Sequence, residues 1–352
     1  MPNSPEIEIA GRKIGLAHPP YVIAELSANH NGSLDAALAI IDHAAAAGAS
    51  AMKMQTYRAD TITLDSNRPE FQITSGKWAG QSLYALYESA YTPWDWHEAL
   101  FARAKARGVT MFSSPFDATA VDLLEGLNAP AYKIASFEAV DLPLIRYAAS
   151  TGKPMIISTG MADADEIAEA IAAARDAGCR DLAILHCVSG YPAPAGDYNL
   201  RTIPDMMNRF GLVTGLSDHT LDNTTAIAAV ALGASIIEKH VTLDRNGGGP
   251  DDSFSLEPAE FAHLCSASRT AWDALGAVDY GRKSSERGNA IFRRSLYFVR
   301  DLKAGEVITP ESVRSVRPGF GAAPKHLDAI LGRRVLRDVQ AETPVDLGVI
   351  AP

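Results

Sequence analysis

The chain has 352 residues, of which 47% are hydrophobic and 21% charged, and its formal net charge is -10 at pH 7. This length exceeds that of one typical domain, and the composition is that of a folded globular chain. The negative charge disfavours a broad nucleic-acid-binding surface. No apolar run approaches the roughly 18 residues that span a bilayer, and the N-terminus lacks the basic and apolar stretches of a secretory signal. We therefore expect neither a nucleic-acid partner nor a membrane.

Cysteine usage points to a reducing compartment. The three cysteines, Cys179, Cys187 and Cys265, cannot form a disulfide framework, and they lack the spacing of metal ligands. Free thiols are typical of cytosolic proteins. We therefore expect a cytoplasmic protein with reduced cysteines.

The elements follow a regular order along the chain. Residues 6–15 alternate apolar and polar positions around Ala10-Gly11, as in a small β-hairpin. After them, short β-type runs alternate with longer helical patterns. The expected strands are residues 21–26, 51–55, 110–113, 131–135, 155–158, 182–187, 212–216 and 235–239, and helices are expected at 34–47, 93–107, 164–177, 224–232 and 258–275.

This repetition predicts an α/β fold, a (β/α)8 TIM barrel of about 250 residues followed by a small domain. An open doubly wound sheet is the alternative, but it would more often carry a Gly-rich dinucleotide loop after its first strand. Here that loop, residues 27–32, reads SANHNG. The expected divisions are an N-terminal hairpin extension at 1–16, the barrel at 17–275, a linker at 276–293 and a C-terminal domain at 294–352. That last part is too small to bury much core alone, so we expect it to lean on another surface.

Active groups of such barrels gather at the C-terminal ends of the strands. The polar side chains that fall at the expected strand ends are Glu25, Lys53, Gln55, Ser113, Ser114, Lys133, Ser136, Ser158, His186, Ser217, Asp218, His219, Glu238 and His240.

Two lysines stand out because buried lysines need partners. Lys53 shares one strand face with Gln55, and Lys133 repeats the arrangement two strands later. One interpretation is a structural ion pair with Glu25 or Glu238. The other is an anion clamp that binds a phosphate or carboxylate with help from strand-end hydroxyls. Those hydroxyls would belong to Ser114, Ser136 and Ser217.

Two histidines predict a metal site. His219 and His240 follow the seventh and eighth strands, so their rings should meet at one divalent ion and leave positions open for substrate oxygens. Asp218 could orient one ring. Five other histidines are expected to be structural: His18, His43, His97, His263 and His326.

Four further residues are candidates for the site. Glu25 either pairs with Lys53 or handles a proton. Tyr191 lies in a Pro-rich turn after the sixth strand and could contact a ligand. Asp251 follows a glycine run and could accept sugar hydroxyl groups. Arg317 begins a rigid Pro-Gly turn in the C-terminal domain, although a surface arginine is the commoner explanation.

Several of these segments together resemble the sialic acid synthase family. They are AELSANHNG at 24–32, MKMQTY at 52–57, YKIAS at 132–136, GLSDHT at 215–220 and EKH at 238–240. The part around 317–319 resembles the C-terminal antifreeze-like (SAF) domain of that family. The segments SANH at 27–30, YTPW at 91–94, SGYP at 189–192 and RPGFG at 317–321 are most similar to the pseudaminic acid synthase branch.

The resemblance implies a TIM-barrel enzyme that condenses phosphoenolpyruvate with an open-chain amino-sugar aldose, giving a nine-carbon 2-keto acid and phosphate. For this branch the aldose is 2,4-diacetamido-2,4,6-trideoxy-altrose. It further implies a divalent metal, Mn2+ with Mg2+ or Co2+ as alternatives, and a domain-swapped homodimer. Carried over by motif, Lys53, Ser114, Lys133, Ser136, Ser189 and Ser217 would bind phosphoenolpyruvate, His219 and His240 the metal, and Gln55, Glu138, Tyr191 and Asp251 the sugar. The catalytic set would be Glu25, Lys53 and Arg317, with the arginine supplied by the partner subunit.

Alternatives remain at this point. An N-acetylneuraminic or legionaminic acid synthase would use a different aldose. A pyruvate-lyase aldolase would form a Schiff base on Lys53 or Lys133. A non-catalytic carbohydrate- or ice-binding protein would keep the SAF domain without the reaction.

Overall fold

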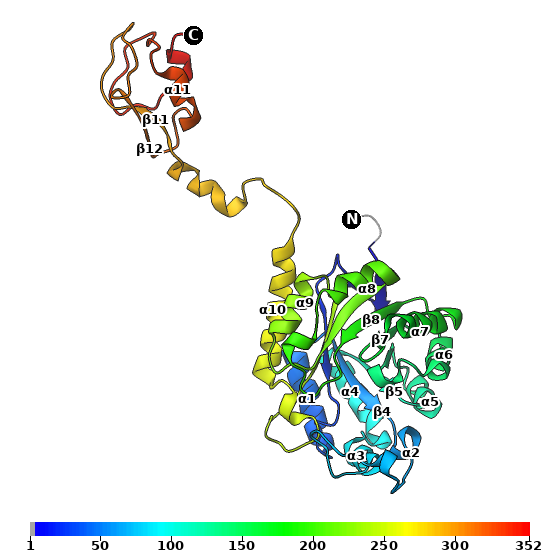
Figure 1. Ribbon diagram of the computed structural model, residues 1–352. Coiled ribbons are helices and arrows are strands. Elements are labelled where there is room, and N and C mark those ends of the chain that lie inside the picture. The colour runs from blue at the N-terminus through cyan, green and yellow to red at the C-terminus, as the bar shows by residue number, and fades with distance from the viewer. Residues whose placement is uncertain (1–3) are drawn as a thin grey trace. The chain divides into compact units, whose positions relative to one another are not determined.

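A computed structural model describes residues 4–352, and the chain divides after Gly276 into two compact units (Figure 1). The first unit contains the expected TIM barrel. Eight parallel strands close in the order β10-β3-β4-β5-β6-β7-β8-β9. They are β3 (Tyr21–Glu25), β4 (Ala51–Thr56), β5 (Thr110–Pro115), β6 (Tyr132–Ile134), β7 (Met155–Ser158), β8 (Leu182–Cys187), β9 (Val213–Asp218) and β10 (Ile236–His240).

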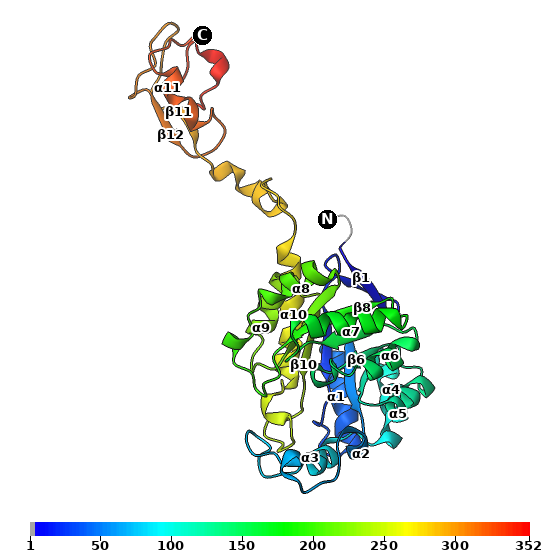
Figure 2. The ribbon, with the colours of Figure 1, turned by 45° about the vertical axis from the view of Figure 1, so that its right-hand side comes forward.

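Helices surround the barrel because each strand returns through a crossover (Figures 1 and 2). Their ends follow local signals: Ser33 and Asp163 cap helix N-termini with their side chains, and Gly108 ends a helix in the left-handed conformation. The helices are α1 (Leu34–Ala46), α4 (His97–Arg107), α5 (Ala118–Gly126), α6 (Leu142–Ser150), α7 (Ala164–Asp176), α8 (Thr202–Phe210), α9 (Thr224–Ala231) and α10 (Pro258–Leu275). The 3-10 helices of this unit are Pro69–Phe71, Trp94–Trp96, Ser136–Glu138, Ala195–Asp197 and Asp252–Phe254.

A hairpin closes the N-terminal end of the barrel. It comprises β1 (Glu6–Ile9) and β2 (Arg12–Gly15), antiparallel to each other. Ile7, Ile9 and Ile14 are buried and pack in one cluster with residues near the starts of the barrel strands. Figure 2 shows β1 on the side opposite α2 and α3. The C-terminal ends of the strands are therefore the end left for a site.

The connection between β4 and α4 is longer than the others and covers that end. It contains α2 (Ala59–Ile62) and α3 (Leu83–Ala90), and a short antiparallel bridge joins Gln72 to Ser82. At its tip the Trp78 indole donates to the Pro250 carbonyl oxygen over 3.3 Å, and the Lys77 ammonium donates to Ser253 over 2.8 Å. These contacts tie the connection to the loop that follows β10.

The second unit has a small core of its own, and the expectation that it also leans on another surface stays a prediction. Strands β11 (Ser295–Phe298) and β12 (Val313–Val316) pair antiparallel. The apolar cluster includes buried side chains from both strands and from α11 (Leu327–Ile330). Its 3-10 helices are Ser284–Phe292, Pro324–His326 and Leu347–Val349. The expected divisions at 16/17 and 293/294 stay predictions. Among residues 4–352, the helices are all too short or too polar to cross a bilayer.

Candidate active site

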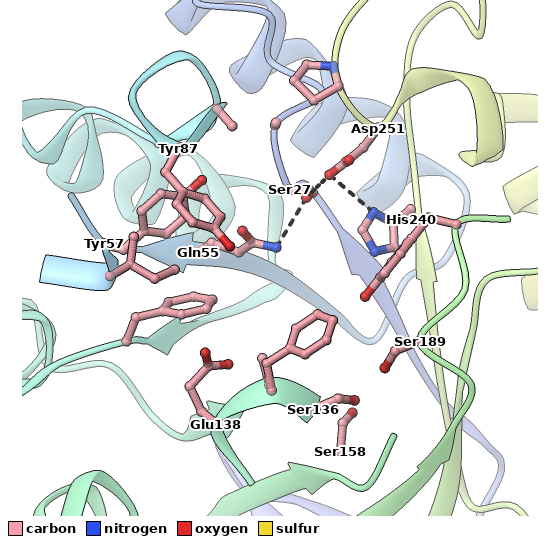
Figure 3. Close-up of a pocket in the computed structure, with 18 of the residues that line it drawn as sticks. Ser27, Gln55, Tyr57, Tyr87, Ser136, Glu138, Ser158, Ser189, His240 and Asp251 are labelled. Carbon is pink, nitrogen blue, oxygen red and sulfur yellow. Dashed lines mark hydrogen bonds and ion pairs between the residues drawn. The ribbon is translucent and has the colours of Figure 1, made fainter. Parts of the chain in front are cut away.

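A cavity of about 510 Å³ opens at the C-terminal ends of the barrel strands. Figure 3 shows part of its lining, with side chains from several strands turned toward one space. The predicted site residues that line it are Lys53, Gln55, Lys133, Ser136, Glu138, Ser189, Tyr191, Ser217, His219, His240 and Asp251.

The two lysines point into the barrel and share one carboxylate. Lys53 Nζ lies 2.6 Å from Glu25 Oε2 and 2.9 Å from Glu238 Oε1, and Lys133 Nζ lies 3.2 Å from the same Glu238 oxygen. The parallel register produces this cluster, because Glu25 is paired with Lys53 along β3 and β4. All four groups are almost fully buried. The expected ion pair is therefore present, and its lysines still face the cavity, so the two interpretations are compatible.

Burial sets the protonation of this cluster. It lowers the pKa of Lys53 to about 8, even though the Glu238 carboxylate favours the charged amine. Burial alone would raise the pKa of Glu238, but Lys133 and Lys53 outweigh it and hold that pKa below its usual value. Glu238 is thus a fixed anion between two amines, and an arriving substrate anion would meet both amines at once.

Hydroxyl groups surround the lysines. The Oγ atoms of Ser114 and Ser158 are buried without a hydrogen-bond partner within residues 4–352, whereas Ser217 donates to Glu238 Oε1 over 3.2 Å. Ser114 is buried behind the cavity wall and is absent from its lining. Unpaired buried hydroxyls are costly unless a ligand or water satisfies them. Ser158 was not assigned a role from the sequence; its place as the last residue of β7 was the signal available.

Gly160 lies against two of the serines that line the cavity. Its N–H donates to Ser136 Oγ over 3.2 Å. A Cβ atom at this position would lie 2.3 Å from Ser189 Oγ and 2.8 Å from Ser136 Oγ, so only glycine leaves room for both hydroxyls. Ser136, Ser158 and Ser189 therefore line the cavity as a set of small hydroxyl groups, which is suited to a phosphate.

His219 and His240 also meet at the cavity, with ring centroids 5.3 Å apart. His219 Nδ1 donates to the Val188 carbonyl oxygen over 2.9 Å, which leaves Nε2 as a free acceptor. His240 Nδ1 has no hydrogen-bond partner among the described residues and lies 4.0 Å from Asp251 Oδ2. Burial and the neighbouring His219 hold the pKa of His240 well below its usual value. Each ring therefore has a nitrogen that could bind a divalent metal.

These two imidazoles are the metal ligands expected from the described part of the chain. No group of three or more His, Cys, Asp or Glu side chains within residues 4–352 is arranged to hold a metal ion. Any bound ion would therefore take its remaining ligands from substrate, water or Asp251. This donor set suits an ion that meets its substrate directly.

The expectation that Asp218 orients a histidine ring is wrong. Its carboxylate pairs instead with Lys239 over 2.7 Å and accepts from the Thr220 N–H over 2.9 Å. The His219 ring is oriented by the Val188 carbonyl oxygen and not by Asp218. A buried lysine needs a countercharge, and adjacent strands β9 and β10 bring Lys239 beside Asp218.

The residues expected at the sugar also line the cavity. Gln55 Nε2 donates to Ser27 Oγ over 3.2 Å, and the Ser27 hydroxyl donates to the Asp251 carboxylate. The Tyr191 ring packs on His219 with centroids 4.5 Å apart. Burial raises the pKa of Glu138 to about 7, and its Oε2 has no partner within residues 4–352. Apolar side chains of the β4–α4 connection complete the wall: Ile62, Ile73, Trp78, Leu83, Leu86 and Tyr87.

Besides Ser114, two predicted residues lie outside the cavity lining. Glu25 is fully buried, and its carboxylate contacts Lys53 and the Ser27 N–H. Arg317 belongs to the second unit, where it is exposed directly after β12.

His97, expected to be structural, is buried and hydrogen-bonded to the Thr56 hydroxyl and the Pro93 carbonyl oxygen.

Comparisons with known proteins agree with this arrangement. Residues 40–280 match the NeuB family model, and residues 293–347 match the SAF domain. Pseudaminic acid synthase from Campylobacter jejuni subsp. jejuni serotype O:23/36 is 42% identical over 91% of this chain and 93% of that protein. Pseudaminic acid synthase from Helicobacter pylori is 40% identical over 94% and 97%.

A solved structure of a related protein has the same fold. The N-acetylneuraminic acid (sialic acid) synthetase from Leptospira borgpetersenii serovar Hardjo-bovis, in complex with citrate, is 32% identical and superposes with a TM-score of 0.73 over 81% of this chain and 95% of that one. The family match spans more than half of the chain, and the barrel and SAF domain stand in the order that the resemblance predicted. The chain therefore belongs to the NeuB family.

Proposed function

We propose that this protein is an enzyme that condenses phosphoenolpyruvate with 2,4-diacetamido-2,4,6-trideoxy-altrose, the reaction of a pseudaminic acid synthase. The observation that carries the proposal is one cavity in which Lys53, Lys133 and a set of serines face His219 and His240. Relatives named pseudaminic acid synthase at 40% identity and above support this aldose. The reaction is a C–C bond-forming transfer.

Phosphoenolpyruvate would bind at the buried lysines. Lys53 and Lys133 offset its charges, and Ser136, Ser189 and Ser217 donate to its oxygens. Ser158 extends the same set. Burial strengthens these contacts because water does not compete with them. The anion would also restore the usual protonation of Lys53, whose pKa burial has lowered.

The aldose would lie between Gln55, Glu138, Tyr191 and Asp251. His219 and His240 would hold a divalent ion, Mn2+ with Mg2+ or Co2+ as alternatives. When bound, such an ion supplies Lewis-acid polarisation of the aldehyde oxygen. The residues themselves orient the aldehyde carbon toward C3 of phosphoenolpyruvate.

Bond formation from C3 to the aldehyde carbon leaves positive charge at C2. Water adds at C2, and the tetrahedral product of that addition expels phosphate by C–O cleavage. Glu25, held beside Lys53 at 2.6 Å, would stabilise the charge or guide the water. The lysines receive the leaving phosphate. No amine adds to a carbonyl group in these reaction steps, so neither lysine acts as a nucleophile.

Arg317 would complete the site from the partner subunit of a domain-swapped homodimer. Its exposed place on a separate unit leaves the guanidinium free for such a contact. We further propose a cytoplasmic location, in keeping with the three unbridged cysteines.

A direct assay tests the proposal. Purified protein, phosphoenolpyruvate and the diacetamido-trideoxy-altrose should release phosphate only when both substrates are present, and EDTA should abolish the release. N-acetylmannosamine and the legionaminic acid precursor serve as competing aldoses, and faster turnover with either would reassign the substrate. A borohydride-trapped pyruvate adduct on Lys53 or Lys133 would favour the aldolase alternative. Sugar binding without phosphate release would favour the non-catalytic one.

A further inference from the structure

Ser27 has a strained backbone at the edge of the cavity. It is the second residue after β3, and its φ is 45°, in the left-handed region that glycine adopts freely and other residues adopt at a cost. Seven non-glycine residues within 4–352 have a positive φ, and among them only Ser27 lines the cavity. Strain of this kind persists where surrounding contacts maintain it, and it often marks a functional position.

Hydrogen bonds show what the strained conformation achieves. The Ser27 N–H donates to Glu25 Oε1 over 2.8 Å. Its hydroxyl donates to the Asp251 carboxylate and accepts from Gln55 Nε2 over 3.2 Å, as Figure 3 shows. The residue is only 2% exposed. One side chain thus joins the end of β3, the end of β4 and the loop after β10.

The direction of these bonds fixes the neighbouring groups. The hydroxyl has a single proton, and it donates this proton to the Asp251 side chain. The hydroxyl must then accept from Gln55, which places the amide nitrogen of Gln55 at Ser27 and leaves its carbonyl oxygen for other donors. Both Gln55 and Asp251 therefore offer oxygen acceptors of defined direction to the cavity. Such a pair suits the N–H and O–H groups of an acetamido sugar.

We propose that Ser27 is a positioning residue for the aldose, whose hydroxyl holds the Gln55 amide and the Asp251 carboxylate in their binding orientations. This inference rests on the proposed function, because it takes those two residues as sugar contacts. Glycine would adopt the same backbone without strain but would lack the hydroxyl. In this proposal, Ser27 lowers the stability of the fold through its backbone strain and contributes to sugar recognition through its hydroxyl.

Three variants separate stability from recognition. Ser27→Gly removes both the strain and the hydroxyl, Ser27→Ala removes the hydroxyl and keeps the strain, and Ala10→Gly relieves a φ of 49° in the distant hairpin turn. For each variant we would measure Tm, the KM values for the aldose and for phosphoenolpyruvate, and, with phosphoenolpyruvate present, the Kd of the alditol made by reducing the aldose. The alditol lacks the aldehyde, so it reports binding without turnover.

In Ser27→Gly, the KM for the aldose and the Kd of the alditol should rise about tenfold, the size expected for loss of a hydrogen bond to a charged group. The KM for phosphoenolpyruvate should stay within about twofold, because the lysine cluster does not depend on the hydroxyl. Tm should stay constant or rise. Ser27→Ala should show the same weakening with a lower Tm than Ser27→Gly, and Ala10→Gly should leave all binding constants unchanged.

Two results would overturn the assignment: an unchanged aldose KM in Ser27→Gly, or equal increases in both KM values, which would indicate a general distortion. Failure of the proposed function looks different, because the wild-type protein would then release no phosphate from phosphoenolpyruvate and this aldose.

Discussion

His219 and His240 lie with ring centroids 5.3 Å apart at the ends of neighbouring strands, and each ring has a nitrogen without a hydrogen bond inside the described chain. One ring is fixed by the Val188 carbonyl oxygen. If these rings hold the metal, His219→Ala and His240→Ala should each weaken Mn2+ binding by at least about a hundredfold, more than the loss of a group that merely orients a ligand. Isothermal titration with Mn2+ measures this directly. His97→Ala is the control for loss of a buried histidine, and equal Mn2+ affinity in all three variants would contradict the assignment.

Deprotonation of Lys53 should lower kcat/KM for phosphoenolpyruvate at alkaline pH. Burial lowers the pKa of this amine to about 8. Above that pH the free enzyme loses the positive charge that attracts the substrate, so kcat/KM for phosphoenolpyruvate should fall roughly tenfold per pH unit. The profile should be recorded with saturating aldose from pH 6 to pH 10. A flat profile between pH 8 and pH 10 would show that the charge of Lys53 is not required.

Glu138 should make stability depend on pH in the opposite sense from most carboxylates. Burial raises its pKa from 4.5 to about 7 in the folded protein. The folded state therefore holds a proton that the unfolded state releases between these values, and stability falls as pH rises through this window. Glu138→Gln does not titrate, so its Tm should exceed that of wild type by about 2–4 °C at pH 8 and by less at pH 5.

The exposed Glu169→Gln on α7 is the matched control, for which no such pH-dependent difference is expected. If the difference between Glu138→Gln and wild type is the same at both pH values, Glu138 does not hold this proton.

Arg317 can be tested for action between subunits. Arg317→Ala and Lys53→Ala should each lose most activity alone, because each removes one charge that the substrate anion meets. Mixed and reassociated, a random population of dimers should recover up to about a quarter of wild-type activity, since half of the dimers carry one intact site of two. The exposed Arg314→Ala on β12 is a control that should remain active. Absence of any recovery would place Arg317 outside the partner's site.

Much of the barrel could be predicted because its signal is local. The runs at 155–158 and 182–187 coincide with β7 and β8, since a strand buried on both faces appears as a short apolar run between glycine-terminated helices. The lysines and histidines were found for the same reason: the end of a strand is visible in the sequence, and strand ends meet at one side of the barrel.

The parts that sequence reasoning missed depend on distant contacts. The tip of the β4–α4 connection is held where Trp78 donates to the Pro250 carbonyl oxygen, and nothing in the local sequence pattern indicates that partner. The position of Asp218 directly before His219 predicts that its carboxylate orients a histidine ring. The pairing of β9 with β10 instead brings that carboxylate into an ion pair with Lys239. Ser27 carries no sequence signal of strain, because its φ follows from bonds to Glu25 and Asp251 made only in the folded chain.

The hairpin beneath the barrel has a consequence for the order of events. Ile7 and Ile9 close the barrel at the N-terminal ends of its strands. Substrates and products therefore enter and leave at the C-terminal ends. The buried amines of Lys53 and Lys133 are deep, whereas Gln55 and Glu138 are only partly covered. The enol ester must therefore load before the sugar, and a sugar bound first would obstruct it. Steady-state kinetics should show compulsory-order binding, with the alditol uncompetitive against phosphoenolpyruvate; competitive inhibition by the alditol would contradict this sequence.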